Sequence, residues 1–460
     1  MQDRIHHIVE SQQVRFASGQ TKSLEYRIRQ LRILERMCLE NEEEIVRAVR
    51  ADLGRDYFDA YMSEVGSIVW EIRYVLRKLR TWARPHAIRI PLSVAPASAR
   101  FHHEPLGCCL IIGTWNYPIH LVLKPLIGAL AAGNCCILKP GELAAKSSAL
   151  LQKIVPGYFD SSSVAVVAGD ASITSWLLDI RFDLIFFTGS RSVASIVMSK
   201  AARNLTPVVL ELGGSNPCIV TERTKIKTAA KRIVWAALFN TGQTCLAPGF
   251  IVTHSSIFER LIDEAIAQIR GFYRDTPEDD PAFGRIVSTG HAKRIELLLE
   301  GQDLRWGGKV NVAERYVEPT VVVSREWGNP LIVEEVFGPV LTFLEYSNLN
   351  EMFRRIQALE RPLAIYLFTQ NRSTVRLFNR MSSSGALVIN DLVVHAATNT
   401  IPLGGVGKSG FGSYRGKAGF ETFSHKKPVL RRRLSFDWSI RYPPHRRPGN
   451  LLKKILRRFM

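Results

Sequence analysis

Hydrophobic residues in the first 80 positions recur at the spacing of α-helices. Leu24, Ile28 and Leu31 are three or four residues apart, and the same period continues up to Gly54. This spacing places apolar side chains on one helical face, and a glycine is a typical helix stop. Residues 62–82 repeat the pattern. The N-terminal part is therefore predicted to be helical.

A different pattern follows in residues 84–107. The stretch RPHAIRIPLSVAPASARFHHEPLG is punctuated by prolines and partly extended. Proline lacks a backbone N–H and marks turns and loops rather than helix interiors. We predict that this stretch forms a connection or a projecting arm.

From residue 106 onward, short apolar runs alternate with helical stretches. The runs are CCLIIG, CCILK, VAVVAG, LIFFTG and VVLELGG, and helices are predicted over 119–132, 144–154 and 191–203. Alternation of this kind indicates right-handed βαβ units and a mostly parallel sheet. Ligands of such sheets bind beyond the carboxyl ends of the strands.

A second set of elements begins near residue 217. NPCIVTE precedes a predicted helix over 226–239, the loop NTGQTC and the run GFIVTH. PTVVV, EEVFGPVLTFLEY, LAIYLFTQ and GALVIND follow with helices between them. This set predicts a second α/β domain.

The composition is that of a soluble globular protein. Among the 460 residues, 46% are hydrophobic and 22% are charged, as in ordinary globular domains. The seven cysteines form no disulfide framework, which indicates a reducing compartment. The N-terminus lacks the features of a secretory signal. Lys124 and Pro125 interrupt the most apolar window, against a membrane span. We therefore expect a cytoplasmic protein.

The positive charge is concentrated at the C-terminus. The net charge is +19, and residues 431–460 contain ten Lys or Arg and one Asp. In LLKKILRRFM the apolar and basic residues take opposite sides of a helix, the pattern of an interfacial amphipathic helix. Residues 446–460 could attach the protein peripherally to an anionic membrane surface, or they could dock on the protein itself or fray.

One cysteine has an unusual setting. Cys245 lies in NTGQTCLAPG, among small polar residues and glycines, whereas the other cysteines lie mostly in apolar runs. A glycine-flanked loop can expose a thiol and point backbone N–H groups at an oxyanion. Cys245 is a candidate nucleophile; the alternative is a loop cysteine without a role.

Polar residues also follow several predicted strands. Glu211 in VVLELGG lies at the end of a predicted strand, before a Gly-Gly turn, and could act as a general base, while Asn116 in IIGTWNYP could donate to an oxyanion. Each has a simpler interpretation, as a capping glutamate and a turn asparagine. Lys139 and Glu142 in ILKPGE suit phosphate or ribose hydroxyls, or they are surface charges.

Two further segments suit a nucleotide. FFTGSRSV carries Gly189 and Ser190 at the start of a predicted helix, where free N–H groups attract phosphate, although no G-x-G-x-x-G motif is present. Glu335 in EEVFGP could bind a sugar diol. The glycine-rich stretch 401–412 either completes this set or is only a flexible connection.

Taken together and in this order, these motifs resemble the NAD(P)-dependent aldehyde dehydrogenase superfamily. The closest resemblance is to its class 3 branch, including bacterial and cyanobacterial members. The motifs are TWNYP, LKPGE, FFTGS, LELGG, NTGQTC, EEVFGPVL, IND, PLGGVGKSGFGSYRGKAGFETFSHKK and RYPP.

The resemblance implies a role for each matching residue. Cys245 matches the catalytic nucleophile, Glu211 the general base and Asn116 the oxyanion-hole amide. The residues that match cofactor contacts are Trp115, Lys139, Glu142, Gly189, Ser190, Glu335 and Phe337. The implied cofactor is NAD or NADP, and no metal is expected. In the implied reaction, the thiolate attacks the aldehyde, hydride passes to the nicotinamide, and water activated by Glu211 releases a carboxylate from the thioester.

The resemblance also implies a fold of class α/β with three parts. A Rossmann-like cofactor domain takes 1–80 and 105–210, and an α/β catalytic domain takes 211–395. A small β oligomerisation arm with the C-terminal segment takes 81–104 and 396–430, before the basic amphipathic tail 431–460. The arm implies a homodimer.

Some residues depart from the family pattern. Ser215-Asn216, Ala194 and Pro248-Gly249 replace Lys-Ser, a glycine and Pro-Asp of many relatives. Ala194 leaves the choice between NAD and NADP open. The expected substrates are medium- to long-chain aliphatic, aromatic or apocarotenoid aldehydes.

Two alternatives remain on sequence grounds. The first is a relative that passes the thioester to coenzyme A, against which Glu211 argues. The second is a membrane- or nucleic-acid-binding protein on a vestigial dehydrogenase fold, against which the set Cys245, Glu211 and Asn116 argues. We therefore expect no nucleic acid as partner.

Overall fold

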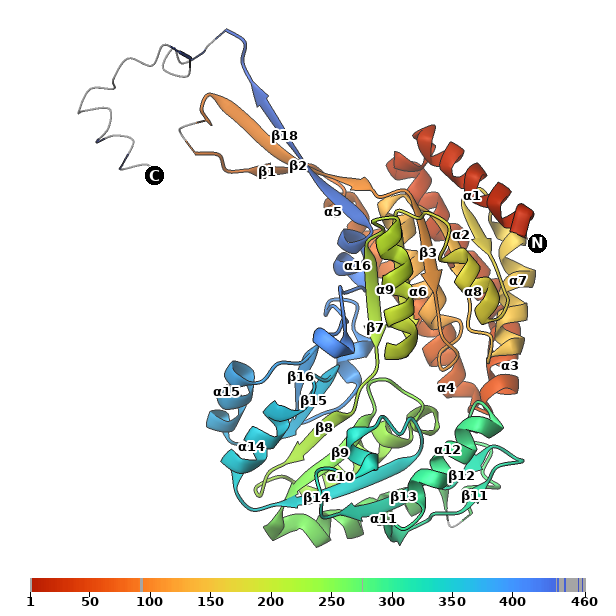
Figure 1. Cartoon of the computed structure of the whole chain (residues 1–460), viewed down its shortest axis with the longest axis vertical. Helices are drawn as coiled ribbons and strands as arrows, with labels where there is room; N and C mark the ends of the chain where they lie inside the picture. The colour runs from red at the N-terminus through yellow and green to blue at the C-terminus, as the bar shows by residue number, and fades with distance from the viewer. Residues whose placement is uncertain are drawn as a thin grey trace.

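The computed structural model describes residues 2–91, 94–274 and 276–435, and the single residues 437, 442, 443, 454 and 457. Two large sheets with covering helices form the body, and a three-stranded sheet projects from it (Figure 1). The amphipathic stretch predicted over 446–460 lies outside the described residues except for Lys454 and Arg457. None of the described helices is long and apolar enough to cross a membrane.

The first large sheet has the order β17-β7-β6-β3-β4-β5. Its strands are β3 (Cys108–Ile112), β4 (Cys135–Lys139), β5 (Val164–Val166), β6 (Leu184–Gly189), β7 (Val208–Leu212) and β17 (Gly410–Phe411). Neighbouring strands are parallel, as predicted, except that β17 runs antiparallel to β7. The helices of this part are α6 (His120–Ala132), α7 (Ala145–Tyr158), α8 (Ala171–Leu177) and α9 (Arg191–Arg203). The predicted helices are therefore confirmed, with α7 four residues longer.

The N-terminal helices pack beside this sheet (Figure 1). They are α1 (Gln2–Ala17), α2 (Leu24–Glu40), α3 (Glu42–Leu53), α4 (Tyr57–Tyr61), a π-helical turn η2 (Met62–Gly66) and α5 (Ser67–Trp82). Gly54 adopts the left-handed conformation, with φ of 64°, and ends α3 as predicted. Sequence analysis missed α1, because only Ile5, Val9 and Gln12 of this helix are buried and no clear apolar stripe results.

The second large sheet has the order β10-β13-β14-β9-β8-β15-β16. Its strands are β8 (Asn216–Val220), β9 (Pro248–His254), β10 (Asp303–Trp306), β13 (Thr320–Ser324), β14 (Val340–Tyr346), β15 (Ala364–Phe368) and β16 (Ala386–Ile389). The helices are α10 (Ile226–Leu238), α11 (Phe258–Tyr273), α12 (Thr289–Leu299), α13 (Pro330–Val333), α14 (Leu349–Ala358) and α15 (Arg372–Met381). A small hairpin, β11 (Val310–Asn311) and β12 (Tyr316–Val317), lies outside this sheet. All pairs in the large sheet are parallel except β10 with β13.

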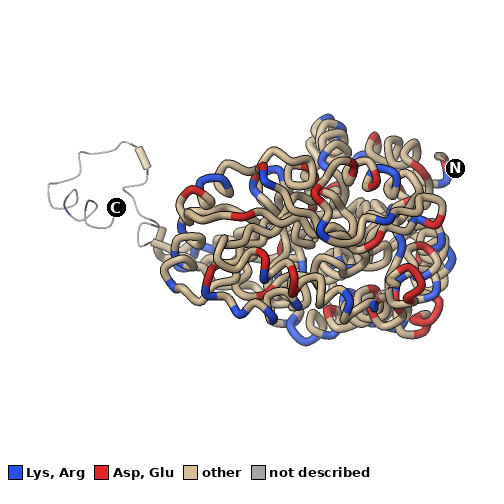
Figure 2. The backbone as a smooth tube through the Cα atoms, turned by 90° about the horizontal axis from the view of Figure 1, so that it is seen from below, with Lys and Arg blue, Asp and Glu red and all other residues tan. Residues whose placement is uncertain are grey.

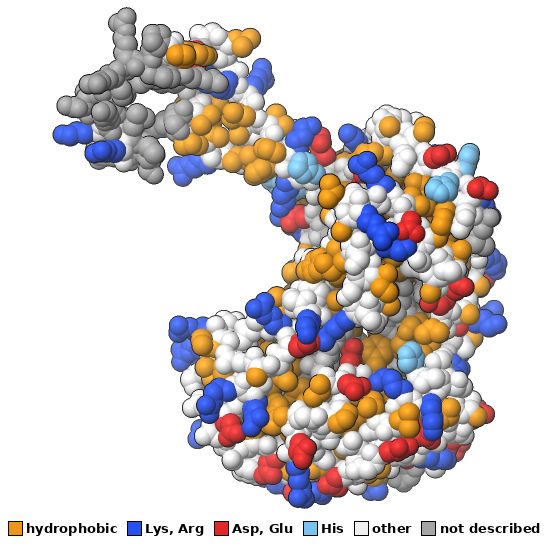
Figure 3. Space-filling model, in the orientation of Figure 1, with side chains coloured by type: hydrophobic (Ala, Val, Ile, Leu, Met, Phe, Trp, Pro, Cys, Tyr) orange, Lys and Arg blue, Asp and Glu red, His pale blue; other side chains and the backbone are white. Residues whose placement is uncertain are grey.

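The projecting arm consists of β1 (His86–Ile88), β2 (Ala97–Pro105) and β18 (Ser424–Arg432). Nine residue pairs join β2 to β18, two segments that are more than 300 positions apart in the chain. Acidic and basic residues are interspersed over the body (Figure 2). On the arm, by contrast, hydrophobic side chains gather on the surface, including Phe101, Val429 and Leu430 (Figure 3).

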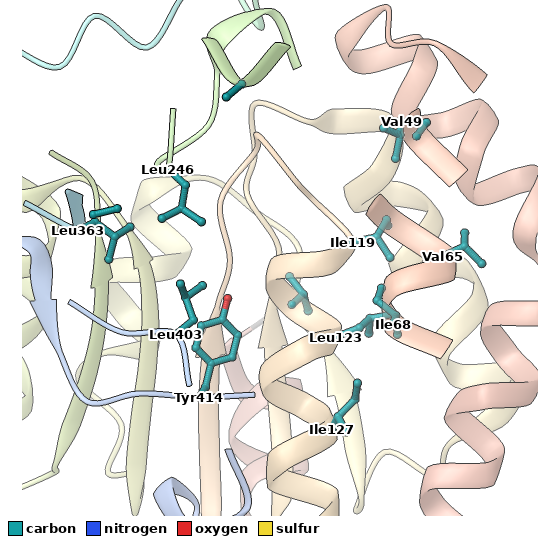
Figure 4. Packing of buried hydrophobic residues seen from close by; sticks show 14 of the residues in the cluster. Val49, Val65, Ile68, Ile119, Leu123, Ile127, Leu246, Leu363, Leu403 and Tyr414 are labelled. Atoms are coloured by element: carbon teal, nitrogen blue, oxygen red, sulfur yellow. The ribbon is translucent and has the colours of Figure 1, made fainter. Parts of the chain in front are cut away.

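The main hydrophobic core forms around α6. Ile119, Leu123 and Ile127 are fully buried and lie beside Val65 and Ile68 (Figure 4). Every residue from 121 to 132 is buried, so α6 is apolar on all sides rather than along one stripe. The helix therefore resembles a membrane segment in composition while packing inside a globular protein.

An ion pair is buried in this core. The Lys124 ammonium lies 3.0 Å from the Glu71 carboxylate, and both side chains are only 2% exposed. Glu71 also accepts a hydrogen bond of 2.8 Å from the backbone N–H of Gly416, the first residue of α16 (Gly416–Thr422). Burial lowers the pKa of Lys124 to about 8, and Glu71 opposes this shift. The pair thus links α5, α6 and the start of α16.

Breaking this ion pair should destabilise the protein. We expect Glu71→Ala to cost about 3–5 kcal/mol, because it leaves a buried ammonium without its counter-charge. The thermal unfolding midpoint should fall, and the double variant Glu71→Leu with Lys124→Met should recover much of the loss. A midpoint within about one degree of wild type for Glu71→Ala would contradict this account.

Candidate active site

A cavity of about 940 Å³ lies between the two large sheets. Its lining comes from segments at or after the ends of β3, β6 and β7, from the loop after α10, from parts of α4, η2 and α5, and from residues further along the chain that include 335, 337, 393, 394, 396, 397, 403, 414 and 415. The first three are carboxyl ends of parallel strands, which is where the sequence predicted a ligand. Residues from both halves of the chain therefore face one space.

Cys245 faces this cavity from a loop held by buried hydrogen bonds. Among the seven cysteines it is the one that is partly exposed, and the other six are buried. The Asn216 side-chain amide donates to the carbonyls of Cys245 and Ala247 at 2.8 and 2.9 Å. Asn216 is fully buried and also accepts from the backbone N–H of Ala364. Asn216, which the sequence analysis noted only as a departure from the family pattern, thus holds the loop that carries the Cys245 thiol.

The cavity by itself does not favour the thiolate. Burial raises the pKa of Cys245 to about 12, and the negative charges of Glu335 and Glu211 act in the same direction. Arg415 opposes them. Most charged groups around this sulfur therefore oppose its ionisation.

Glu211 reaches the cavity from the end of β7. It is paired in register with Gly410 of β17 and Thr188 of β6. Its side chain is 5% exposed, and its Oε1 atom has no hydrogen-bond partner among the described residues. Burial holds the pKa of Glu211 well above its ordinary value, and Arg415 opposes this shift. A carboxylate whose pKa is raised in this way is a stronger base than an ordinary glutamate.

Asn116 connects the loop after β3 to the Cys245 loop. Its side-chain amide donates to the backbone carbonyl of Gln243 at 3.0 Å, and its backbone carbonyl accepts from the Asn240 side chain at 2.8 Å. A primary amide has two N–H groups. One is therefore left to serve a ligand in the cavity, which Asn116 lines together with Cys245 and Glu211. The structure thus brings together the three residues that the sequence singled out.

The predicted nucleotide residues fall into two groups. Gly189, Ser190, Trp115, Glu335 and Phe337 line the same cavity as Cys245. Ser190 is the N-cap of α9, so the free N–H groups of this 13-residue helix lie at the cavity wall. Helix N-termini of this kind bind phosphate.

Lys139 and Glu142 form the second group, which does not line this cavity. Lys139 is the last residue of β4, the strand next to β3 in the sheet, and Glu142 lies in the loop that follows. The Lys139 ammonium donates to the carbonyl of Pro140 at 2.8 Å and lies 3.3 Å from the Glu142 carboxylate. Burial lowers the pKa of Lys139, and Glu142 opposes this shift. The pair is therefore positioned beside the cavity rather than in it.

The groups in the cavity fit a dinucleotide. Glu335 accepts a hydrogen bond of 3.0 Å from the Gly214 N–H, and a Cβ on Gly213 would lie 2.3 Å from its Oε2 atom. The absence of a side chain at Gly213 therefore allows the Glu335 carboxylate to approach the backbone of residues 213 and 214. The Trp115 and Phe337 rings meet edge to face at 5.3 Å and form an aromatic wall. A carboxylate, an aromatic wall and a helix N-terminus are the groups that ribose, nicotinamide and phosphate require.

Sequence analysis missed several cavity residues. Arg415 and His120 lie in or beside recognised motifs, but nothing in their spacing marks them. The large apolar side chains of the cavity were also not identifiable; they are Phe58, Tyr61, Met62, Trp70, Tyr117, Leu121, Trp235, Phe239, Val393, Val394 and Leu403. They come from separate helices and loops, which only the folded chain brings together.

Comparisons with known proteins agree with this arrangement. The sequence model of the aldehyde dehydrogenase family matches residues 1–429. The protein "Aldehyde dehydrogenase, dimeric NADP-preferring" of Canis lupus familiaris is 39% identical over 96% of this chain and 98% of its own. Aldehyde dehydrogenase family 3 member H1 of Arabidopsis thaliana is 40% identical, over 96% and 92%. The substrate-bound structure of Staphylococcus aureus AldH has 35% identity and a TM-score of 0.95, covering 99% of both chains.

Proposed function

This chain belongs to the aldehyde dehydrogenase family and oxidises aldehydes with NAD or NADP, and on that premise we propose that Cys245, Glu211 and Asn116 carry out the reaction. The observation that supports this assignment is their presence in one cavity, although they are far apart in the chain. We further propose residues 1–80 and 105–210 as the cofactor domain and 211–395 as the catalytic domain.

The first step is the attack of the Cys245 thiolate on the aldehyde carbonyl. A carbon–sulfur bond forms, and the carbonyl electron pair moves onto oxygen. The free N–H of the Asn116 amide and the backbone N–H of Cys245 donate to this oxyanion. Such donors act strongly in a cavity that excludes water, because little else screens the developing charge.

The cofactor residues hold the nucleotide beside this carbon. The nicotinamide, when bound, supplies the hydride acceptor. Ser190 and the α9 N-terminus suit phosphate, and Glu335 suits a ribose diol. Trp115 and Phe337 supply the aromatic wall, and Gly189 keeps the backbone open. Lys139 and Glu142 would contact the part of the nucleotide that extends toward β4.

The second step uses Glu211 as general base. Loss of hydride leaves an acyl group on Cys245 as a thioester. Glu211 takes a proton from water, whose oxygen attacks the acyl carbon, and the carbon–sulfur bond breaks. A carboxylate product leaves, and the thiolate is restored.

The cavity lining supports apolar substrates. Aromatic and aliphatic side chains from α4, η2, α5, α10 and residues 393–397 surround the sulfur. Burial of hydrocarbon against such a wall is favourable by roughly 25 cal/mol per Å². We therefore propose medium- to long-chain aliphatic, aromatic or apocarotenoid aldehydes as substrates.

We also propose that the arm pairs two copies of this chain. Phe101, Val429 and Leu430 are 37%, 40% and 53% exposed on β2 and β18. Contiguous apolar surface of this kind is typical of interfaces. The canine relative is named dimeric. Attachment of residues 446–460 to an anionic membrane remains part of the proposal, tested by co-sedimentation with anionic vesicles.

A cofactor-reduction screen tests the proposed function. Aldehydes of increasing chain length are supplied with NAD or NADP, and absorbance at the reduced-nicotinamide band is followed. We expect turnover that improves with apolar chain length, with a free carboxylic acid as product. An acyl-coenzyme A product would support the acylating alternative. The absence of reduction with any aldehyde, together with salt-sensitive nucleic-acid binding, would support the binding-protein alternative.

Removal of the Asn116 amide should slow the first step. We expect Asn116→Ala to lower kcat by about 10²–10³-fold, the usual loss for one oxyanion donor. The matched control is Asn350→Ala, which removes an exposed asparagine amide on α14 and should leave kcat unchanged. Equal kcat values for Asn116→Ala and wild type would remove Asn116 from the mechanism.

A further inference from the structure

Arg415 lies inside the catalytic cavity, at the turn that precedes α16. Its side chain is 5% exposed and lines the same space as Cys245 and Glu211. The preceding residue, Tyr414, extends toward Leu403 in the same region (Figure 4). Arg415 has a φ of 80°, a conformation that non-glycine residues adopt only where surrounding contacts impose it. The turn is held by the hydrogen bond from Gly416 to Glu71, described above with the buried ion pair.

The Arg415 guanidinium interacts with His120 and with Tyr414, and two of its three nitrogen atoms have no hydrogen-bond partner among the described residues. Its Nη2 atom lies 3.4 Å from His120 Nε2. His120 Nδ1 lies 2.9 Å from the carbonyl of Ser63, so the imidazole donates there and accepts from Arg415. Nε and Nη1 of Arg415 have no partner among the described residues. Buried donors without a partner are unfavourable, which points to an anion or a ligand oxygen as their function.

The charge of Arg415 acts on both reacting groups. Several titratable side chains interact electrostatically with Cys245 or Glu211. Those that can carry a negative charge are Glu335, Tyr117 and Tyr414, and the one cation is Arg415. Tyr366 also faces Cys245. Arg415 itself is faced by His120, Lys124 and His395, whose pKa values are lowered first by burial and further by Arg415.

Other basic residues of the cavity do not supply this charge. Arg294 donates through its guanidinium to the backbone carbonyls of Glu335 and Val336. Burial lowers the pKa of His120 and of His291, which favours their neutral forms. Among the described residues that act on Cys245, Arg415 is therefore the only cation.

We propose that Arg415 is an electrostatic positioning residue, whose partly unpaired guanidinium stabilises the anionic forms of Cys245 and Glu211. The inference rests on the roles proposed for those two residues. A fixed positive charge in a cavity of low dielectric favours nearby anions far more than it would in water. Without this positive charge, the ionised forms of Glu211, Glu335 and Cys245 would repel one another in the same cavity.

Alkylation of Cys245 tests the proposal without turnover. The cofactor-free protein is treated with iodoacetamide over a range of pH, and labelling of the Cys245 peptide is followed by mass spectrometry. Only the thiolate reacts with iodoacetamide. We therefore expect Cys245 in Arg415→Gln to be alkylated at least about threefold more slowly than in wild type near neutral pH. Arg415→Lys, which keeps the charge, should recover most of the rate. The control Lys408→Met removes a cation from the exposed surface and should match wild type.

A kinetic readout separates the electrostatic role from a structural one. In Arg415→Gln the acid limb of the kcat profile should move to higher pH, because both anions lose the charge that stabilises them. Arg415→Lys should restore the wild-type limb, with little change in KM. A change in KM alone would overturn the proposal, since it would show that Arg415 only binds substrate.

Folding and function are controlled separately. Thermal melting identifies a variant that does not fold, and Arg415→Met then replaces Arg415→Gln. An alkylation profile identical to wild type in a folded, uncharged variant overturns the role of Arg415. Failure of the wild-type protein to oxidise aldehydes would overturn the proposed function instead, because alkylation does not depend on turnover.

Discussion

Cys245→Ala should abolish aldehyde oxidation. We expect kcat to fall by at least about 10⁴-fold, because without a sulfur nucleophile there is no covalent intermediate from which hydride can leave. Binding of NADP should persist, since Cys245 contributes none of the groups assigned to phosphate or ribose. The measurements are reduced-nicotinamide formation with a saturating aldehyde and NADP binding by fluorescence quenching.

The control for this variant is another cysteine. Cys38 is fully buried in α2 and does not line the cavity. Cys38→Ala should therefore keep kcat close to wild type, although it costs some stability through the lost packing. Retention of more than about one per cent of wild-type kcat in Cys245→Ala would be incompatible with its role as nucleophile.

The wild-type thiol should also show a characteristic pH dependence. Burial and two carboxylates raise the pKa of Cys245 to about 12, so the thiol form predominates in the cofactor-free cavity at neutral pH. Alkylation should therefore accelerate continuously as the pH rises toward that value. Acceleration that levels off below neutral pH would show that the thiolate is already formed and would contradict this assignment.

Glu211→Gln should stop the reaction after hydride transfer. We expect about one equivalent of reduced cofactor per site in a rapid burst, followed by turnover slower by about 10²–10⁴-fold, the usual contribution of a general base. The glutamine keeps the size of the side chain but cannot take a proton from water. Rapid-mixing absorbance gives the burst, and mass spectrometry gives the acyl group on Cys245.

Two observations complete this test. Hydroxylamine, which cleaves thioesters without a general base, should restore turnover in Glu211→Gln. Glu345→Gln, an exposed carboxylate on β14, should behave as wild type. If Glu211→Gln showed no burst, the carboxylate would be required before hydride transfer, and its assignment to hydrolysis would be wrong.

The pH dependence of hydrolysis follows from burial of Glu211. Because burial raises the pKa of this carboxyl well above its ordinary value, the base form appears at a higher pH than in an ordinary glutamate. Hydrolysis should become faster as the pH rises through the raised pKa. This rise of the hydrolysis rate with pH should be absent from the pH profile of kcat in Glu211→Gln.

The sequence by itself predicted most of the helices and strands and singled out the candidate reacting groups. The alternation of apolar runs and helical stretches predicted β3, β4, β6 and β7, and it placed α9 over 191–203. Local periodicity is sufficient for this purpose, because each element buries the face that its own residues define. Since parallel strands end at the same edge of a sheet, Asn116 and Glu211 could be expected near one another before any coordinates.

The tertiary structure alone decided what surrounds those groups. The helix α6 is buried on every side, so its sequence carries no stripe to show what packs against it. The antiparallel strand β17 brings the stretch 401–412, which by itself could pass for a connection, against Glu211. Arg415 lines the same cavity as Cys245, 170 positions away in the chain, and Lys139 pairs with Glu142 outside that cavity.

The physical reason is the range of the interactions involved. Helices, strands and their ends follow from neighbours within a few residues, which the sequence displays directly. Burial, electrostatic coupling and the shape of a cavity depend on groups that meet only after distant segments pack together. The sequence therefore singled out Cys245, Glu211 and Asn116 as candidates, whereas their surroundings, which are the apolar wall and the charge of Arg415 in the same cavity, were set by the fold.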